Sequence, residues 1–305
     1  MTESAPKLPW DVKGVRLHWP RDAHLVYVVS RMGIARSVDV WPLLYGSHGA
    51  GKMGFARLQR LSLLRMFPRA NLAEHAWYGL VPEAAPWVAE AMGCDEDELR
   101  VVHGISRMNL GAVRDRNRFW VSAVLACRAR AGARVALVRP EWEFRRARES
   151  GTRLVPDLQL VLEVADGSGP AELVWFIEFD AGTERLAVLE GKARAYLEAA
   201  RLGSFYGELR WSVLVLVPSI RRARSVAAAM HRASAERTWV AVQSELEEAN
   251  ALEPRLWRAD ELALNPKAPP RWSLLGASSP SRESEPRPRS AADRGSANDS
   301  RGGSR

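Results

Sequence analysis

Two neighbouring stretches of the chain decide its fold: VPDLQLVL at residues 155–162 and WFIEFDAGTERLAVLEGKARAY at residues 175–196. Apolar residues crowd both stretches, which predicts strands over residues 154–164 and 173–179. After the second strand, apolar residues recur at helical spacing, which predicts a helix over residues 183–201. Two strands followed at once by a helix indicate an α/β domain.

The segments on either side of these stretches extend the pattern. Their periodicity predicts a helix over residues 113–131 and a strand over 134–138, then, after the opening stretches, a strand over 211–217, a helix over 220–232 and a strand over 238–242. The predicted order is therefore α-β-β-β-α-β-α-β. The run WSVLVLV at residues 211–217 is apolar on both sides, so we expect a sheet that is covered by helices on both faces.

Acidic residues stand at the ends of two predicted strands. Asp157 begins one strand, and Glu178 and Asp180 end the next. Residues two apart in a strand face the same side, and pairing of the two strands as a hairpin brings Asp157 beside Glu178 and Asp180. Three carboxylates that meet repel one another unless a cation lies between them, and such hard oxygen ligands suit Mg²⁺ or Mn²⁺. We therefore predict that Asp157, Glu178 and Asp180 are metal ligands.

The next helix supplies candidates for the chemistry itself. Thr183 marks its start, and Lys192 and Tyr196 share one of its faces. An amine there can neutralise charge that develops on a phosphate or hold an attacking water, so Lys192 is a catalytic candidate with Thr183 and Tyr196 in support. Glu141, in the segment RPEWEF, is a candidate base or further ligand. The alternative is that the strand-end acids are only solvated and that Lys192 is a surface group.

Residues 21–100 predict a separate helical domain. Helices are expected near residues 22–32, 37–45 and 55–66, followed by a strand over 76–81 and a helix over 82–92. Three helices followed by a hairpin form the layout of a winged helix-turn-helix, whose third helix enters the major groove of DNA. Lys52, Arg57 and Arg60 are therefore predicted to contact DNA. The alternative is a small helical bundle that only packs against its neighbour.

The segment GSHGAGK at residues 46–52 has the spacing of a phosphate-binding loop but lacks its context. Met53 stands where such a loop has Ser or Thr, and the preceding segment is predicted as helix rather than strand. We interpret the glycines as a turn between the second and third helices.

The composition limits the class of protein. Lys and Arg total 44 against 36 Asp and Glu, and the net charge of +8 favours an anionic partner such as nucleic acid. Two cysteines, Cys94 and Cys127, cannot form a disulfide framework and are typical of a reducing cytosol. Without an apolar signal core or a stretch of membrane-spanning length, the protein is expected to be soluble and cytoplasmic. Residues 1–20 are expected to form an extension, and residues 276–305, which lack large apolar side chains, a disordered tail.

The two opening stretches resemble the replication-relaxation family, which occurs in bacteria and often on plasmids or other mobile elements. The matching pattern comprises Pro156-Asp157, Glu178, Asp180, Gly182-Thr183-Glu184, Lys192 and Tyr196. The segments WYGLVPEAAPWVAEAMG (77–93), HGISRMNLGAVRDRNRFW (103–120) and RPEWEF (139–144) also fit. The resemblance covers about residues 20–260.

This resemblance implies a winged helix-turn-helix domain at residues 21–100 and, at residues 101–275, a mixed α/β core similar to the PD-(D/E)xK nuclease superfamily, with the order α-β-β-β-α-β. It implies a role in plasmid replication or DNA relaxation, double-stranded DNA as the partner, and metal-dependent nicking as the reaction. Other replication or mobilisation proteins and a second copy of the chain are further candidate partners. One departure matters: the nuclease motif has lysine two positions after the acid, where this chain has Asp180, so Lys192 must reach the site from its helix.

These patterns leave three hypotheses open. The first is a DNA-binding protein with an active metal-dependent endonuclease core. The second is a DNA-binding replication initiator or regulator whose core does not cut. The third is a winged-helix transcription regulator whose α/β part dimerises or senses a ligand. Only the first requires four side chains to gather closely: Asp157, Glu178, Asp180 and Lys192.

Overall fold

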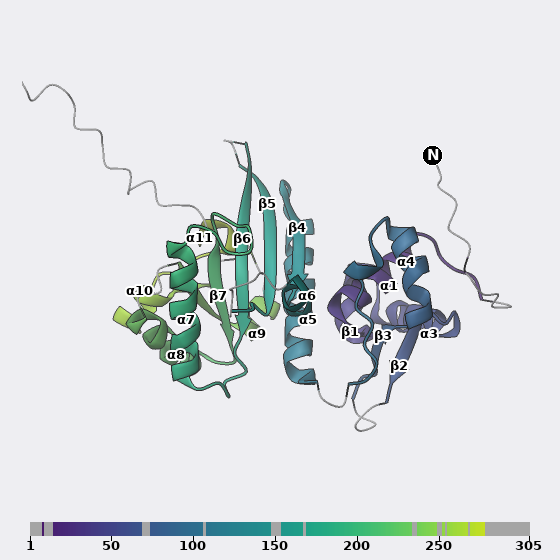
Figure 1. Ribbon diagram of the computed structural model, residues 1–305, viewed down its shortest axis with the longest axis horizontal. Coiled ribbons are helices and arrows are strands. Elements are labelled where there is room, and N and C mark those ends of the chain that lie inside the picture. The colour runs from purple at the N-terminus through teal and green to yellow at the C-terminus, as the bar shows by residue number, and fades with distance from the viewer. Residues whose placement is uncertain are drawn as a thin grey trace, which may run out of the picture.

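The elements of the chain form two groups that lie side by side, one from residues 15–105 and one from residues 108–277 (Figure 1). We call them the N-terminal unit and the sheet unit. The computed structural model describes residues 8, 15–68, 74–105, 108–147, 154–166, 169–233, 237–248, 252–253, 255–267 and 269–277. Most of the predicted extension (1–20) and nearly all of the predicted tail (276–305) lie outside the described residues.

The N-terminal unit packs short helices around a three-stranded antiparallel sheet in which β3 lies between β1 and β2. In chain order its elements are α1 (Arg21–Met32), β1 (Ile34–Arg36), α2 (Ser37–Val40), the 3-10 turn η1 (Trp41–Leu43), α3 (His48–Arg60), β2 (Leu64–Phe67), β3 (Trp77–Leu80), η2 (Pro82–Ala84), α4 (Ala85–Met92) and η3 (Glu96–Glu98). The predicted first helix, the strand over 76–81 and the helix over 82–92 are confirmed. β1 was missed because three residues carry no periodicity.

The third helix begins and ends earlier than the predicted range 55–66. α3 starts at His48, and the side chain of Ser47 caps it by accepting a hydrogen bond from the Ala50 N–H at 3.2 Å. The helix ends at Arg60, and the residues soon after it form β2 because they pair with β3. The apolar pattern runs through both elements, so it could not separate helix from strand.

Glycines inside α3 permit close packing, so the interpretation as a turn was wrong for them and holds only for Gly46, in the bend before α3. A Cβ atom on Gly51 would lie 2.4 Å from the Cβ of Trp41, and one on Gly54 would lie 2.1 Å from the hydroxyl of Tyr45. No larger residue fits these contacts without a shift. The glycines therefore bring α3 against η1 and the residues after it.

The sheet unit contains a six-stranded sheet with the strand order β4-β5-β6-β7-β8-β9. Its elements are α5 (Leu110–Arg128), β4 (Ala133–Pro140), α6 (Glu141–Ala147), β5 (Leu158–Asp166), β6 (Gly169–Phe179), α7 (Leu186–Arg201), β7 (Ser212–Val217), α8 (Ile220–Arg232), β8 (Thr238–Val242), α9 (Gln243–Glu248), β9 (Trp257–Arg258), α10 (Ala259–Leu264) and α11 (Leu274–Ala277). The predicted order is present, with α6 inserted after the first strand. The first three strands and the last pair are antiparallel neighbours, whereas β6, β7 and β8 are parallel.

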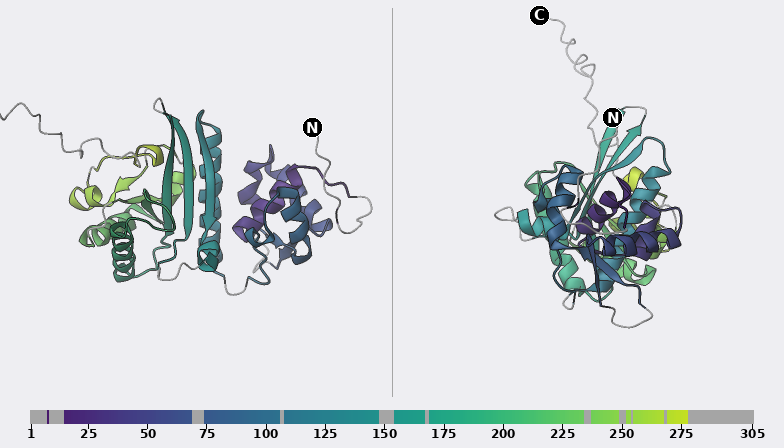
Figure 2. Two further views of the ribbon diagram at one scale, coloured as in Figure 1. Left: turned by 45° about the horizontal axis from the view of Figure 1, so that its top comes forward. Right: turned by 90° about the vertical axis from the view of Figure 1, so that its right-hand side faces the viewer.

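Helices cover both faces of this sheet, as predicted (Figures 1 and 2). α5 and α9 share one apolar core with strand residues such as Leu160, Trp175 and Leu214. α7, α8 and α10 share another with Phe176 and Val215. All six residues of β7 are buried, as expected for a strand between two helical layers.

The two units are joined at α5 and α6. The side-chain amide of Asn117 on α5 donates a hydrogen bond to the Ile34 carbonyl at 2.8 Å. Arg31 at the end of α1 forms an ion pair with Glu143 of α6 at 2.6 Å. One apolar core runs through both units, so they meet across a packed interface. Among the described helices, none has the length and apolar character that crossing a membrane requires.

Candidate functional site

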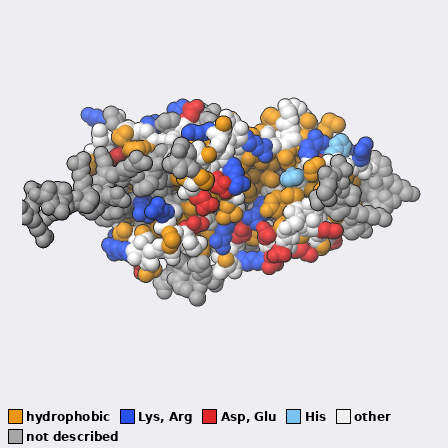
Figure 3. All heavy atoms as spheres, turned by 90° about the horizontal axis from the view of Figure 1, so that it is seen from above, with side chains coloured by type: hydrophobic (Ala, Val, Ile, Leu, Met, Phe, Trp, Pro, Cys, Tyr) orange, Lys and Arg blue, Asp and Glu red, His pale blue; other side chains and the backbone are white. Residues whose placement is uncertain are grey.

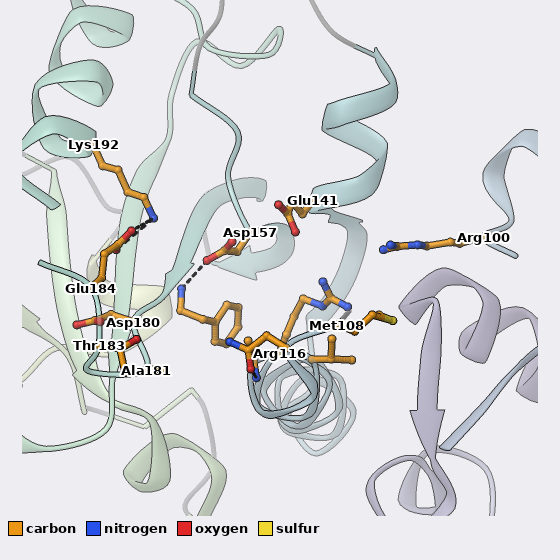
Figure 4. Close-up of a pocket in the computed structure, with 14 residues that line it drawn as sticks. Arg100, Met108, Arg116, Glu141, Asp157, Asp180, Ala181, Thr183, Glu184 and Lys192 are labelled. Carbon is orange, nitrogen blue, oxygen red and sulfur yellow. Dashed lines mark hydrogen bonds and ion pairs between the residues drawn. The ribbon is translucent and has the colours of Figure 1, made fainter. Parts of the chain in front are cut away.

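A cavity of about 510 Å³ lies where the sheet unit meets the end of the N-terminal unit (Figure 4). Its walls come from the segment before α5, from the beginnings of α5 and α6, from the start of β5, the end of β6 and α7. Five predicted site residues line it: Glu141, Asp157, Asp180, Thr183 and Lys192. The cavity therefore brings together most of the predicted site residues, whereas Glu178 and Tyr196 are buried and are not among its lining residues.

Asp157 lies beside the end of β6, as the predicted hairpin required. β5 pairs with β6 in a register that sets Leu158 opposite Ile177, so the residue before β5 adjoins Glu178. The backbone N–H of Phe179 donates a hydrogen bond to Asp157 Oδ2 at 2.8 Å. Burial raises the pKa of Asp157, and this hydrogen bond and the positive charge of Lys192 only partly oppose it.

Glu178 is the most perturbed acid of the site. Its side chain is buried, accepts a hydrogen bond from the Tyr196 hydroxyl at 2.7 Å and forms an ion pair with Lys192 at 2.9 Å. Burial, reinforced by the nearby negative charge of Asp157, raises the pKa of Glu178 from 4.5 to about 7 despite these two partners. Near neutral pH this carboxyl is poised between its protonated and ionised forms.

Lys192 connects the buried acid to the cavity. Its ammonium group contacts Glu178 at 2.9 Å and Glu184 at 3.2 Å, and 27% of the side chain is exposed. Burial by itself lowers the pKa of Lys192, but the surrounding carboxylates outweigh it and raise that pKa. Lys192 is thus charged and points into the cavity rather than away from it (Figure 4).

Asp180 has a partner that the sequence analysis did not consider. Arg222 of α8 donates to both of its carboxylate oxygens, at 2.5 and 3.2 Å, and the Gly182 N–H donates to one of them at 2.9 Å. Asp180 is buried, so this pairing neutralises its charge within the fold. Within the described part of the chain, no three His, Cys, Asp or Glu side chains gather closely enough to hold a metal.

The remaining predicted residues occupy the rim. Glu141 begins α6, its backbone N–H bonds to the Asp157 carbonyl at 3.0 Å, and its side chain forms an ion pair with Arg145. This backbone contact holds the start of α6 against the start of β5. Thr183 is exposed at the cavity in the loop before α7, which begins three residues later than predicted.

Two arginines of the cavity, Arg100 and Arg116, were missed by the sequence analysis. Arg116 lies on the buried side of α5, between Val113 and Trp120 at helical spacing. A charged residue within the apolar stripe of a helix was the available signal.

The predicted DNA-binding residues of α3 divide into two groups. Lys52 and Arg60 are exposed, whereas Arg57 bonds to the fully buried Asp22, with its Nε 3.1 Å from a carboxylate oxygen. The structure therefore gives Arg57 a packing role within the N-terminal unit. On the face that Figure 3 shows, acidic and basic side chains intermix, so the net positive charge does not gather there.

Comparison with known proteins gives one family. No curated protein and no solved structure matches the chain. Residues 48–208 match the family described as replication-relaxation, which is more than half of the 305 residues. The matched segment runs from α3 to the loop before β7 and contains Asp157, Glu178 and Lys192. The chain therefore belongs to the replication-relaxation family, as its sequence motifs suggested.

Proposed function

We propose that this protein binds double-stranded DNA through its N-terminal unit and nicks that DNA in the cavity, with Mg²⁺ or Mn²⁺ held by Asp157 and Glu178. The observation that carries the proposal is the convergence of Asp157, Glu178 and Lys192 from the start of β5, the end of β6 and the middle of α7. Acids with raised pKa values beside a lysine in a cavity are typical of functional sites.

The N-terminal unit supports DNA binding by its order of elements. The succession α1-β1-α2-α3-β2-β3 is that of a winged helix-turn-helix, in which the third helix enters the major groove. Lys52 and Arg60 are exposed on α3 and are available to contact phosphates or bases. Arg57 is left out of this proposal because Asp22 holds it.

The order of helices and strands in the sheet unit supports a nuclease-like core. The order α5-β4-β5-β6-α7-β7, with acids at the start of β5 and the end of β6, resembles the PD-(D/E)xK arrangement. The position that usually carries lysine holds Asp180, which is paired with Arg222. Lys192 on α7 takes its place, since its ammonium group already contacts Glu178.

Within the described part of the chain, Asp157 offers a small divalent cation a free carboxylate oxygen, and Glu178 offers one when the Lys192 ammonium group moves from its Oε2 to the phosphate. Mg²⁺ in enzymes is often held by one or two carboxylates together with water and substrate phosphates, so a third acid is unnecessary. Asp157 accepts a hydrogen bond through one oxygen, and its other oxygen has no partner among the described residues. When bound, the cation supplies polarisation of the phosphodiester and a water of lowered pKa. Lys192 then stabilises the negative charge that develops on the phosphate, and Tyr196 holds Glu178 in place.

A nicking assay tests this proposal. Supercoiled plasmid is incubated with the protein and Mg²⁺ or Mn²⁺, and the open-circular form is quantified. Asp157→Asn and Glu178→Gln are each expected to reduce the nicking rate on the order of a hundredfold or more, as for loss of one group that stabilises transition-state charge. The matched control is Glu172→Gln, an exposed acid on the same strand as Glu178, which is expected to keep the wild-type rate. Unchanged nicking in both site variants would overturn the proposal.

A second candidate function is a DNA-binding initiator or regulator that does not cut. It is favoured by the internal neutralisation of the site, where Lys192 and Tyr196 occupy both oxygens of Glu178 and Arg222 occupies Asp180. Salt-sensitive DNA binding without nicking under either metal would select this candidate.

A further inference from the structure

Two arginines line the cavity but have no role in the proposed nicking reaction. Arg100 comes from the segment before α5, and Arg116 from α5 itself. In the close-up, both lie toward the N-terminal unit, Lys192 lies on the opposite side, and Asp157 lies between them (Figure 4). The basic side of the cavity is thus separate from the lysine that serves Glu178.

Arg116 is a buried cation whose hydrogen-bonding capacity is not satisfied. Only 6% of the residue is exposed. One Nη atom donates to the Met32 carbonyl at 3.1 Å, whereas the buried Nε has no hydrogen-bond partner. A buried guanidinium without an anion is unfavourable, because desolvation is not offset by attraction. Burial, reinforced by repulsion from Arg100, accordingly lowers the pKa of Arg116.

Arg100 adds a second, half-buried cation at the same wall. Its stem lies against Gly33, where an added Cβ would come within 3.0 Å of Arg100 Cδ, so the glycine at the end of α1 leaves room for it. Burial lowers the pKa of Arg100, and the attraction of Glu141 only partly compensates. Among the described residues, neither Arg100 nor Arg116 forms an ion pair with a carboxylate.

We propose that Arg100 and Arg116 form a subsite for a backbone phosphate of the DNA strand that enters the cavity, and the choice of DNA as the ligand rests on the proposed function. Guanidinium groups suit this ligand, since their planar donors match phosphate oxygens in pairs. An anion between the two arginines relieves their repulsion and gives the Arg116 guanidinium group a compensating charge. The phosphate is then held on the side of the cavity opposite Lys192, with Asp157 between the two.

The subsite also aligns the two units. Arg116 bonds to the carbonyl of Met32, and Arg100 packs on Gly33, so both arginines are attached to the end of α1. A strand held by the N-terminal unit is therefore placed in a fixed relation to the cavity.

DNA binding measured without divalent metal tests the subsite independently of cutting. Fluorescence anisotropy of a labelled duplex is followed in EDTA over a range of salt concentrations, with the full-length protein. Loss of one phosphate contact lowers the magnitude of the slope of log K against log salt by about one and weakens binding about tenfold at moderate salt. We expect this from Arg100→Gln. The matched control is Arg134→Gln, an exposed arginine at the far end of β4, which is expected to change neither quantity.

Arg116 needs a gentler substitution because it is buried. Arg116→Lys keeps the charge but loses the Nε donor, and we expect it to weaken duplex binding while retaining a cooperative thermal transition. If Arg116→Lys does not fold, Arg100→Gln alone decides. An unchanged salt slope in Arg100→Gln, with normal binding by the wild type, overturns the subsite and leaves the proposed function standing.

A second arm separates the sources of the phosphate. Inorganic phosphate is added to the wild type and to Arg100→Gln, and the melting temperature is recorded. If the wild type does not bind the duplex, the proposed function fails. A rise in melting temperature with phosphate that is lost in Arg100→Gln then retains the anion subsite with a soluble phosphate compound as its ligand. The absence of such a rise overturns the subsite as well.

Discussion

The buried charges of the N-terminal unit and those around the cavity have different surroundings. Asp22 and Asp39 in the N-terminal unit each face arginine, with the Nε of Arg57 3.1 Å from Asp22 and the Nε of Arg36 2.6 Å from Asp39. Arg118 of α5 adds a second contact to Asp39. Each buried acid there has a compensating cation, which is the arrangement expected where charges only support packing.

Around the cavity, Arg222 likewise compensates Asp180, but other charges of like sign adjoin one another. Burial, reinforced by Asp157, raises the pKa of Glu178, and burial, reinforced by Arg100, lowers the pKa of Arg116. Like charges that adjoin one another are unfavourable for folding, and groups perturbed in this way are common at functional sites. The buried acids of the N-terminal unit are thus compensated, whereas Glu178 and Arg116 each keep a neighbour of like charge.

The largest expected effect comes from breaking a compensated pair in the N-terminal unit. Arg57→Ala leaves Asp22 buried without its cation, and removal of one partner from a buried pair costs about 3–5 kcal/mol of unfolding free energy. Urea denaturation measures this loss. The control is Arg60→Ala, three residues further along the same helix and exposed, with an expected change within about 0.5 kcal/mol. Equal stabilities of the two variants would contradict the packing role of Arg57.

The next effect is a pH dependence that originates in the cavity. The folded protein binds a proton on Glu178 more tightly than the unfolded chain, because burial raises this pKa from 4.5 to about 7. Glu178 therefore contributes at most about 3 kcal/mol to the unfolding free energy at low pH. This contribution decreases as the pH rises through the window and is absent above the folded pKa. The measurement is the unfolding free energy of the wild type relative to Glu178→Gln from about pH 4.5 to about pH 8.

Glu178→Gln removes the titrating group. The unfolding free energy of the wild type should therefore fall relative to that of this variant as the pH rises. Glu172→Gln should follow the wild type. Mg²⁺ is expected to diminish the loss, since a cation bound to the ionised form favours the folded state. Parallel curves for the wild type and Glu178→Gln would show that Glu178 titrates normally.

A smaller effect distinguishes tight packing from open space along α3. Gly51→Ala places a Cβ 2.4 Å from that of Trp41 and is expected to destabilise the N-terminal unit by about 1–3 kcal/mol. Gly49→Ala meets nothing within 4 Å and gains helix propensity, so it is expected to stabilise by up to about 1 kcal/mol. Thermal unfolding of both variants shows whether the signs differ. A stabilising Gly51→Ala would refute the close approach of α3 to η1.

The smallest effect on stability concerns the exposed face of α3. Lys52→Gln is expected to change the unfolding free energy by less than about 0.5 kcal/mol. It is also expected to lower the salt slope of duplex binding by about one, because one phosphate contact is lost. Anisotropy titrations measure the slope, with the exposed Arg232→Gln on α8 as the control. An unchanged slope would remove Lys52 from the proposed DNA interface.

Much of the sheet unit was predictable because short stretches of sequence carry the patterns of its strands and helices. The run over β7 is apolar throughout, α7 places Lys192 and Tyr196 one turn apart, and both signals survive in the structure. The adjacency of Asp157 and Glu178 required only that consecutive strands pair, which is common for neighbours in the chain. The start of α3 was missed because the glycines look like a turn until their close partners are known.

The sequence by itself determined the order of helices and strands, the likeness to the replication-relaxation family, and the adjacency of Asp157 and Glu178, because these follow from local residue spacing. The sequence left open whether Lys192 reaches Glu178, and the tertiary structure decided it. Only the tertiary structure decided which charges are compensated. Arg222 reaches Asp180 from 42 residues away, and Arg57 reaches Asp22 from 35 residues away. It likewise brought Arg100 beside Arg116 in the cavity. Such pairings depend on how separate elements pack, because the energy of a charge is set by its neighbours in space rather than in sequence.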